Sequence, residues 1–149
     1  MFIILKLLKM KKEQKDLLLQ DLCSRLPYGV KCDIGDNKPY TLCRIEVDNK
    51  NGHLLDFIED KDGFDVQCYL SEVKPYLFPL SSLTAEQIFL SPFGFKTMDT
   101  IRKNKDWTSI EIDHNDYYEL TDWFNKNHYD YRGLIEKGLA IDITSLNIY

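Results

Sequence analysis

The sequence contains few of the glycine patterns on which common nucleotide and hydrolase sites depend. Its 149 residues hold only seven glycines, and neither G-x-G-x-x-G nor the P-loop pattern G-x-x-x-x-G-K followed by Ser or Thr occurs. The nucleophile elbow G-x-S-x-G of serine hydrolases is missing as well. These absences exclude a standard phosphate-cradling loop. They leave open a site in which aromatic rings and an arginine bind the ligand.

Positive charge is also scarce in this chain. There are 19 Lys and Arg residues against 24 Asp and Glu residues, so the formal net charge is −5. A protein that binds nucleic acid without sequence preference needs a positive field, because binding depends on displacing counterions from the phosphates. We therefore do not expect nucleic acid as a partner.

The four cysteines lack the close spacing of metal ligands. Cys23, Cys32, Cys43 and Cys68 include no C-x-x-C pair, whereas structural zinc sites usually contain such pairs. A chain of this length can build an apolar core without disulfides, which favours free thiols in a reducing compartment. We expect a cytoplasmic protein with no metal ion and no other cofactor.

No hydrophobic run is long enough to cross a membrane. The apolar stretch Met1–Met10 is about half the length that a bilayer requires, and Lys6 and Lys9 interrupt it. No small-residue cleavage site follows, as a secretory signal would need. Because the run Met10–Gln14 is typical of a protein start, we expect residues 1–9 to be an upstream-start extension. We expect no membrane partner.

The residues that are present predict one folded domain over residues 1–149. An apolar fraction of 44% and an aromatic fraction of 13% are typical of a chain with a packed core. The expected fold class is α+β. It has an N-terminal helix, an antiparallel sheet of four or five strands that could close partly into a barrel, and C-terminal helices packed on the sheet.

The first helix is expected over residues 12–26. Its apolar positions recur at helical spacing and are Leu19, Leu22, Cys23 and Leu26. Asp21 falls on the predicted solvent side, and Pro27 ends the helix.

The expected strands are separated by short polar turns, which favour an antiparallel meander. They cover residues 30–34, 40–47, 53–58 and 64–70. In the second of them Leu42 breaks the alternation, whereas Cys43 and Ile45 share one face. Residues 73–80 are predicted to be extended, because each proline keeps its predecessor out of the helical region.

Helices are expected again in the second half of the chain. Thr84 and Gln87 have the spacing of a capping box at a helix start. Residues 115–127 predict the last helix, followed by a turn at 132–137 and a strand at 139–143. The residues expected to anchor the last helix to the sheet are Leu120, Trp123 and Phe124.

The exit from the last helix has the composition of a binding site. It consists of His128, Tyr129, Asp130, Tyr131 and Arg132. Aromatic residues and arginine are enriched at binding hot spots, so we predict these five as binding residues. The alternative is that the aromatic side chains belong to the core and keep only their hydroxyl groups in water.

His128 and Asp130 also form an H-x-D pair. In extended backbone the two side chains would point the same way, and a hydrogen bond between them could tune a general base. Alternatively, a protonated His128 would cap the C-terminal end of the last helix, where its positive charge interacts with the negative end of the helix dipole. Because H-x-D alone is a weak signal, we predict no catalytic residue and no metal ligand.

Three segments carry a family resemblance. They are residues 21–32 (DLCSRLPYGVKC), 73–84 (VKPYLFPLSSLT) and 123–140 (WFNKNHYDYRGLIEKGLA). In these segments the chain resembles an uncharacterised family of small prophage and mobile-element proteins from Bacteroides-type gut bacteria. The resemblance implies a phage or mobile-element context and a cytoplasmic host, and it implies no activity.

Together these observations favour a function in binding. We expect a phage or mobile-element accessory protein that binds a host or phage macromolecule, with a protein as its partner and no catalysis. Assembly into a homo-oligomer stays open. The first alternative is a small-ligand binder, such as an anti-defence protein that sequesters a nucleotide signal. A weaker alternative is a hydrolase that uses His128 and Asp130.

Overall fold

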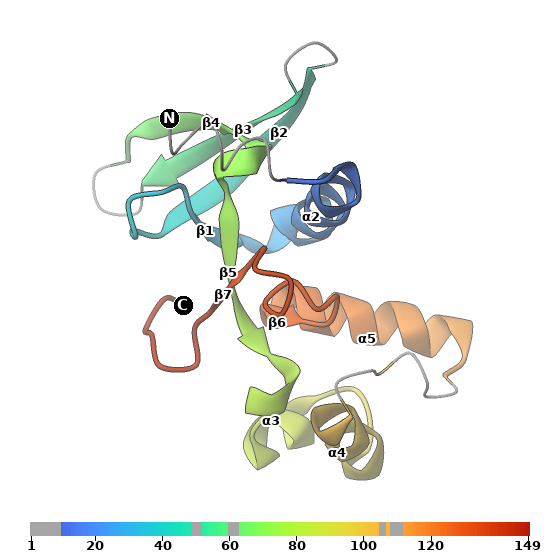
Figure 1. Cartoon of the computed structure of the whole chain (residues 1–149). Helices are drawn as coiled ribbons and strands as arrows, with labels where there is room; N and C mark the ends of the chain where they lie inside the picture. Colours follow the sequence, from blue (N-terminus) through green and yellow to red (C-terminus); the bar gives the residue numbers. More distant parts are fainter. Residues whose placement is uncertain (1–9, 49–51, 60–62, 105–106, 108–111) are drawn as a thin grey trace.

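The structure is a computed structural model and describes residues 10–48, 52–59, 63–104, 107 and 112–149 (Figure 1). The fold is α+β, which confirms the predicted class. The expected upstream-start extension, residues 1–9, lies outside the described residues.

The strands form one sheet with the order β4-β3-β2-β1-β5-β6, and β7 also pairs with β5. The strands are β1 (Lys31–Asp33), β2 (Tyr40–Asp48), β3 (Gly52–Glu59), β4 (Asp65–Tyr69), β5 (Lys74–Pro79), β6 (Tyr129–Asp130) and β7 (Ile141–Asp142). The meander β1–β4 is antiparallel, and β1 also pairs antiparallel with β5. β6 and β7 run parallel to β5.

The sheet is therefore larger and more mixed than predicted. The expected sheet had four or five antiparallel strands, whereas the observed one has seven strands and two parallel pairings. The expected partial barrel is wrong, because the described strand order is open, with β4 at one end and β6 at the other. β7 lies within the strand predicted over 139–143, whereas β6 was not predicted, because a two-residue strand is too short to show an alternating pattern.

A β-bulge in β2 explains the broken alternation at Leu42. Leu42 pairs with Phe57 and Arg44 pairs with Asp56, so the register shifts at the intervening Cys43. Leu42 is buried and Ile45 packs against the same core, whereas Cys43 is exposed, so the prediction that Cys43 and Ile45 share one face is wrong. One extra residue turns the side chains after it to the opposite face.

The described helices are α2 (Lys12–Arg25), α3 (Ala85–Leu90), α4 (Phe95–Lys103) and α5 (His114–Lys126). Three of them, α2, α3 and α5, lie close to their predicted positions, whereas α4 was not predicted. α2 is followed by a 3-10 turn over Leu26–Tyr28 that contains Pro27, as predicted. The capping box between Thr84 and Gln87 is confirmed at the start of α3.

Two apolar clusters hold these elements together. In the first, α2 covers the meander, and its members include Leu18, Leu22, Leu42, Leu55 and Phe57. In the second, α5 packs with α3, α4 and β6, and its members include Ile88, Met98, Ile101, Leu120 and Phe124. α2 packs on the meander, whereas α5 belongs to a separate cluster that includes Tyr129 of β6 and Phe78 of β5. Figure 1 shows α2 and α5 beside different parts of the sheet.

Candidate functional site

The candidate site is built on an aspartate buried between two arginines. Asp21 and Arg25 lie one turn apart on α2, and neither has exposed surface. Arg25 Nε donates to Asp21 Oδ2 at 2.9 Å, and Arg132 Nη1 donates to Oδ1 at 2.8 Å. The prediction that Asp21 faces solvent is therefore wrong, because two guanidinium groups take the place of water around its carboxylate.

This Asp21–Arg25–Arg132 triad carries one more positive charge than negative. Arg132 also donates from Nη2 to Ser24 Oγ at 3.1 Å, and Arg25 donates from Nη2 to the Tyr129 carbonyl oxygen at 2.6 Å. Arg25 Nη1 is buried and has no hydrogen-bond partner among the described residues. Arg25 does not line the cavity that lies beside Arg132, so the positive charge of the triad reaches that cavity through Arg132.

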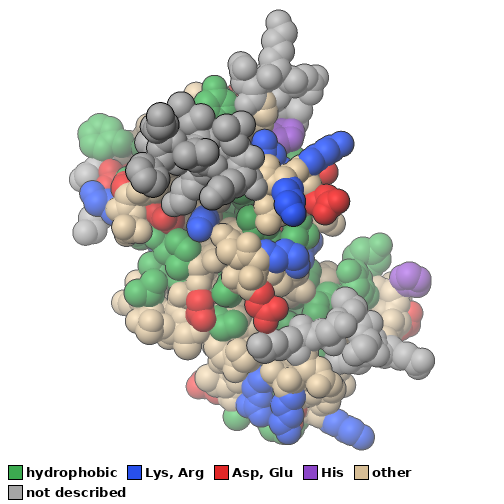
Figure 2. Space-filling model, in the orientation of Figure 1, with side chains coloured by type: hydrophobic (Ala, Val, Ile, Leu, Met, Phe, Trp, Pro, Cys, Tyr) green, Lys and Arg blue, Asp and Glu red, His purple; other side chains and the backbone are tan. Residues whose placement is uncertain are grey.

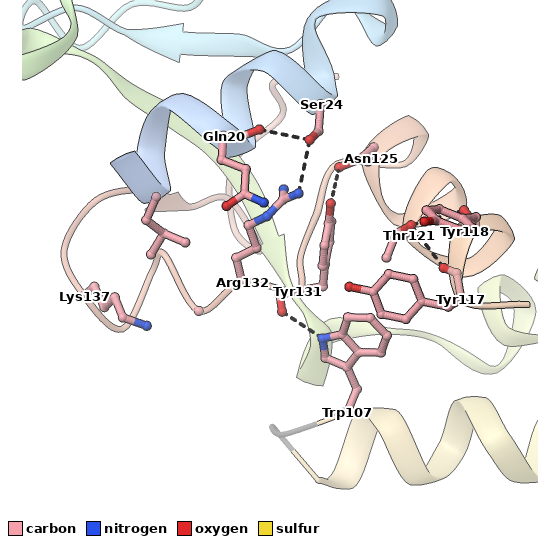
Figure 3. A pocket seen from close by; sticks show the side chains of 12 residues that line it. Gln20, Ser24, Trp107, Tyr117, Tyr118, Thr121, Asn125, Tyr131, Arg132 and Lys137 are labelled. Atoms are coloured by element: carbon pink, nitrogen blue, oxygen red, sulfur yellow. Dashed lines mark hydrogen bonds between the residues drawn. The ribbon is translucent and has the colours of Figure 1, made fainter. Parts of the chain in front are cut away.

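A cavity of about 710 Å³ opens beside Arg132 (Figure 3). Its aromatic lining residues are Trp107, Tyr117, Tyr118 and Tyr131, and its basic ones are Arg132 and Lys137. This volume lies within the range of about 300–1,000 Å³ that is typical of small-molecule sites.

Helix periodicity places the cavity between α2 and α5. Tyr117, Thr121 and Asn125 follow one another at intervals of four along α5, so they share the face that borders the cavity. Gln20 and Ser24 line it from one face of α2. Trp107, which precedes α5, and the segment that follows β6 supply the remaining walls (Figure 3).

Hydrogen bonds and ring contacts hold the aromatic wall in place. Trp107 Nε1 donates to the Tyr131 carbonyl oxygen at 2.8 Å, and the Trp107 ring stacks on Tyr117 with 5.3 Å between centroids. The Tyr131 hydroxyl donates to Asn125 Oδ1 at 3.0 Å. Burial raises the pKa of Tyr131, so this hydroxyl stays protonated and remains a donor.

Arg132 contacts the aromatic residues of the cavity and also supplies positive charge to it. Its guanidinium carbon lies 4.5 Å from the centroid of the Tyr131 ring, within the range of a cation–π contact. Lys137 adds a second positive charge on the same side of the cavity (Figure 3). No Asp or Glu is found among the lining residues that the structure describes, although the whole chain is acidic.

Asp130, one of the predicted binding residues, has a structural role. Its carboxylate accepts hydrogen bonds from the backbone N–H groups of Leu134 and Ile135, both at 2.9 Å. Only 7% of its surface is exposed. Asp130 therefore caps the turn that carries Arg132 and Lys137, in the manner of a helix N-cap.

His128 does not lie in extended backbone. Its φ angle is +64°, and it directly follows Asn127, the C-cap residue of α5. Its ring stacks on Tyr149 with 3.6 Å between centroids. Burial, with a smaller contribution from the charges of Arg25 and Lys31, lowers the pKa of His128 to about 4. The expected positive charge at the helix end is therefore wrong, because the imidazole is neutral near pH 7.

Tyr129 belongs to the second apolar cluster. It is 2% exposed, and its ring stacks on Trp123 with 5.6 Å between centroids. Burial raises the pKa of Tyr129 to about 12. Of the five predicted binding residues, Tyr131 and Arg132 line the cavity, whereas His128, Tyr129 and Asp130 do not.

Several lining residues were missed by the sequence analysis. Trp107 lies well before the predicted binding residues 128–132, and Lys137 lies shortly after them. The sequence around each of these two residues has no pattern that indicates a site. Tyr118 had a usable signal, because it is a large aromatic residue on the polar face of an amphipathic helix.

The described residues offer little for catalysis. His128 and Asp130 have separate partners and neither lines the cavity. Within the described parts of the chain, no group of three or more His, Cys, Asp or Glu side chains is placed to hold a metal ion. The thiols are free, and burial raises the pKa of Cys68 to about 12 and also raises the pKa of Cys32 well above its usual value. Neither buried thiol forms a thiolate near pH 7.

The surface around α3 and α4, outside the cavity, carries exposed apolar and basic side chains. Exposed apolar side chains lie at the α3–α4 turn, namely Phe89, Leu90 and Phe95. Basic residues of α4 lie close by, and Figure 2 shows Lys and Arg side chains gathered at this end of the molecule.

None of the described helices combines the length and apolar character needed to cross a bilayer.

The fold and the site define an α+β protein with an aromatic and cationic cavity. A comparison with protein-family models finds no match, and comparisons with curated proteins and with solved structures find none either.

Proposed function

We propose that this protein acts by binding and that its cavity takes a small anionic ligand. The observation that carries the proposal is the charge of the cavity: Arg132 and Lys137 are the charged residues among its described lining, in a chain of net charge −5. The surplus positive charge of the buried triad acts in the same direction, since an anion beside Arg132 would balance it.

The support network makes the cavity suitable for binding. Asp21 and Ser24 fix the Arg132 guanidinium by hydrogen bonds, and Asp130 holds the turn that presents it. A preorganised cation loses less side-chain entropy on binding than a free surface lysine does. The absence of an acid–base pair in the described lining fits binding without a chemical step.

Thermal unfolding with a panel of anions tests the proposal. An anion at 100 times its dissociation constant should stabilise the protein by about 2.7 kcal/mol, which raises Tm by several degrees. Lys137→Gln should reduce the shift, whereas Lys126→Gln, an exposed lysine outside the cavity, should leave it unchanged. If no anion in a panel of phosphates, polyphosphates, carboxylates and nucleotides raises Tm, the proposal is wrong.

A macromolecular partner is the second candidate, and the exposed apolar group Phe89, Leu90 and Phe95 favours it. Exposed apolar side chains that cluster are typical of protein-binding surfaces. Cross-linking of the wild type and of a Phe89→Ser, Phe95→Ser variant in host cells tests this candidate. Products that persist unchanged in the variant would contradict it, and a shift of the purified wild type to a larger mass would indicate self-association through this surface.

The resemblance to mobile-element proteins suggests a setting for a ligand binder. In a phage or mobile element, an accessory protein of this kind could act in the host cytoplasm by sequestering a nucleotide signal of host defence. The comparison of cells that carry the intact gene with cells that carry its Lys137→Gln variant tests this setting, because only the intact gene should protect the element.

A further inference from the structure

The cavity has two chemically different ends. Arg132 and Lys137 lie at one end, and the rings of Tyr117 and Tyr118 lie at the other, with Tyr131 between them (Figure 3). A ligand that fits both ends must carry its negative charge on one side and a flat apolar group on the other.

The two α5 tyrosines differ from the other aromatic residues in exposure. Tyr118 is 69% exposed and Tyr117 is 43% exposed, whereas Trp107 and Tyr131 are buried. Trp107 stacks behind Tyr117, which keeps that ring in place without covering it fully. Exposed rings held on a helix are suitable platforms for a base, because every nucleobase has a π-face that can stack on tyrosine.

We infer that the ligand is a free nucleotide, with its base stacked on Tyr118 beside the perpendicular ring of Tyr117 and its phosphates at Arg132 and Lys137. The inference rests on the proposed function, since it specifies the anion that the cavity takes. The guanidinium of Arg132 matches phosphate oxygens in geometry, and Lys137 adds a mobile point charge. Phosphate recognition here uses side chains, so the lack of a glycine-rich loop does not count against it.

The surroundings of the cavity favour a free nucleotide over a nucleic-acid strand. Beyond the cavity, the exposed surface of α5 carries Asp116, Glu119 and Asp122. A polynucleotide that left the cavity along α5 would bring its phosphates past these carboxylates. Along α5, therefore, no basic track continues from the cavity on the described residues Asp116, Glu119 and Asp122, whereas a strand needs such a track.

Calorimetric titration of the full chain with a matched series of ligands tests the inference. The series consists of the diphosphates of adenosine, guanosine, cytidine and uridine, inorganic pyrophosphate, the four nucleosides and a short single-stranded oligonucleotide. We expect at least one nucleoside diphosphate to bind more than about fivefold tighter than pyrophosphate, because a stacked base adds binding free energy. We expect the nucleosides and the oligonucleotide to bind more weakly than that diphosphate.

Variants of Tyr118 separate stacking from folding effects. Tyr118→Ala should weaken the nucleoside diphosphate by about 5- to 150-fold and leave pyrophosphate unchanged. Tyr118→Phe keeps the ring and should retain the affinity, and Tyr69→Ala, an exposed tyrosine on β4, should have no effect.

Each contrary outcome points to a different failure. Equal affinity for pyrophosphate and every nucleoside diphosphate would overturn the nucleotide inference and leave the proposed anion binding standing. Tighter binding of the oligonucleotide, or equal binding of a nucleoside without phosphate, would overturn it as well. If neither pyrophosphate nor any nucleotide binds, and another anion does, the inference fails alone; if no anion binds, both fail.

Discussion

The β-meander and the C-terminal segment after α5 are stabilised in different ways. In the meander, β2 and β3 pair along nearly their whole lengths through main-chain hydrogen bonds. In the segment from Tyr129 to Ile143, β6 and β7 have two residues each. That segment depends on hydrogen bonds between polar side chains and its main chain. Arg25 donates to the Tyr129 carbonyl oxygen and Trp107 to the Tyr131 carbonyl oxygen. Asp130 accepts from two backbone N–H groups.

The difference shows why the candidate site lies where it does. A meander satisfies its own main-chain groups, so its side chains are free to alternate between core and solvent. The C-terminal segment has two short pairings with β5, and the buried charged groups Arg25, Asp130 and Asp21 hold the rest of it. Those same groups hold Arg132 at the cavity. Four predictions test this contrast, from the largest expected effect to the smallest.

Asp21→Ala should have the largest effect, because it leaves Arg25 and Arg132 without their shared carboxylate. We expect a loss of about 3–5 kcal/mol in the free energy of unfolding, measured by urea denaturation. Asp16→Ala, an exposed aspartate on the same helix, is the control and should stay within about 0.5 kcal/mol of the wild type. A loss below 1 kcal/mol for Asp21→Ala would mean that the triad does not stabilise the segment.

Asp130→Ala should cost about 2–3 kcal/mol, because two backbone N–H groups lose a charged acceptor, one of them in a buried hydrogen bond. The matched control is Asp142→Ala. Asp142 accepts from Thr144 in a similar local motif but is exposed, so its loss should cost less than about 1 kcal/mol. If urea denaturation gives both variants the same loss in free energy of unfolding, the burial of Asp130 does not strengthen its capping hydrogen bonds.

Acid should destabilise the segment through His128. The pKa of His128 is about 4 in the folded protein against an ordinary value of 6.5. Between these pH values the unfolded chain binds more protons, so stability falls as pH drops from 6.5 toward 4. After allowance for partial exposure of the ring, we expect a loss of about 1–2 kcal/mol at pH 4.5 relative to pH 7.

The control for this effect is His128→Asn, because asparagine tolerates the left-handed backbone at this position. The variant should lose about 1–2 kcal/mol less than the wild type over the same pH interval. Parallel pH profiles of unfolding for the two proteins would show that His128 does not contribute.

Arg44→Ala on β2 should have the smallest effect. Arg44 faces Glu46 at 3.2 Å and Asp56 at 3.8 Å, but its side chain is 64% exposed. Pairs of this kind contribute about 0–1 kcal/mol and weaken in salt. Chemical denaturation at low and high salt measures the effect, and a cost above 2 kcal/mol would show that side-chain charges matter in the meander too.

The sequence was most informative where the physics is local. Alternation predicted the positions of β1–β4, Pro27 marked the end of α2, and the Thr84–Gln87 spacing predicted the start of α3. It was least informative about the site. Tyr131 and Arg132 fell within the predicted segment and line the cavity, but Trp107 and Tyr118 also line it and were not predicted.

The sequence by itself determined the α+β class, the main elements and most of their ends, because these follow from the spacing of apolar residues and from turn and cap residues. Only the tertiary structure decided that Asp21 is buried, since its second partner, Arg132, lies 111 residues away. The same holds for the parallel pairing of β6 and β7 with β5 and for the cavity between α2 and α5. Packing chooses among many distant partners for a charged side chain, and nothing in its local sequence specifies which of them it meets.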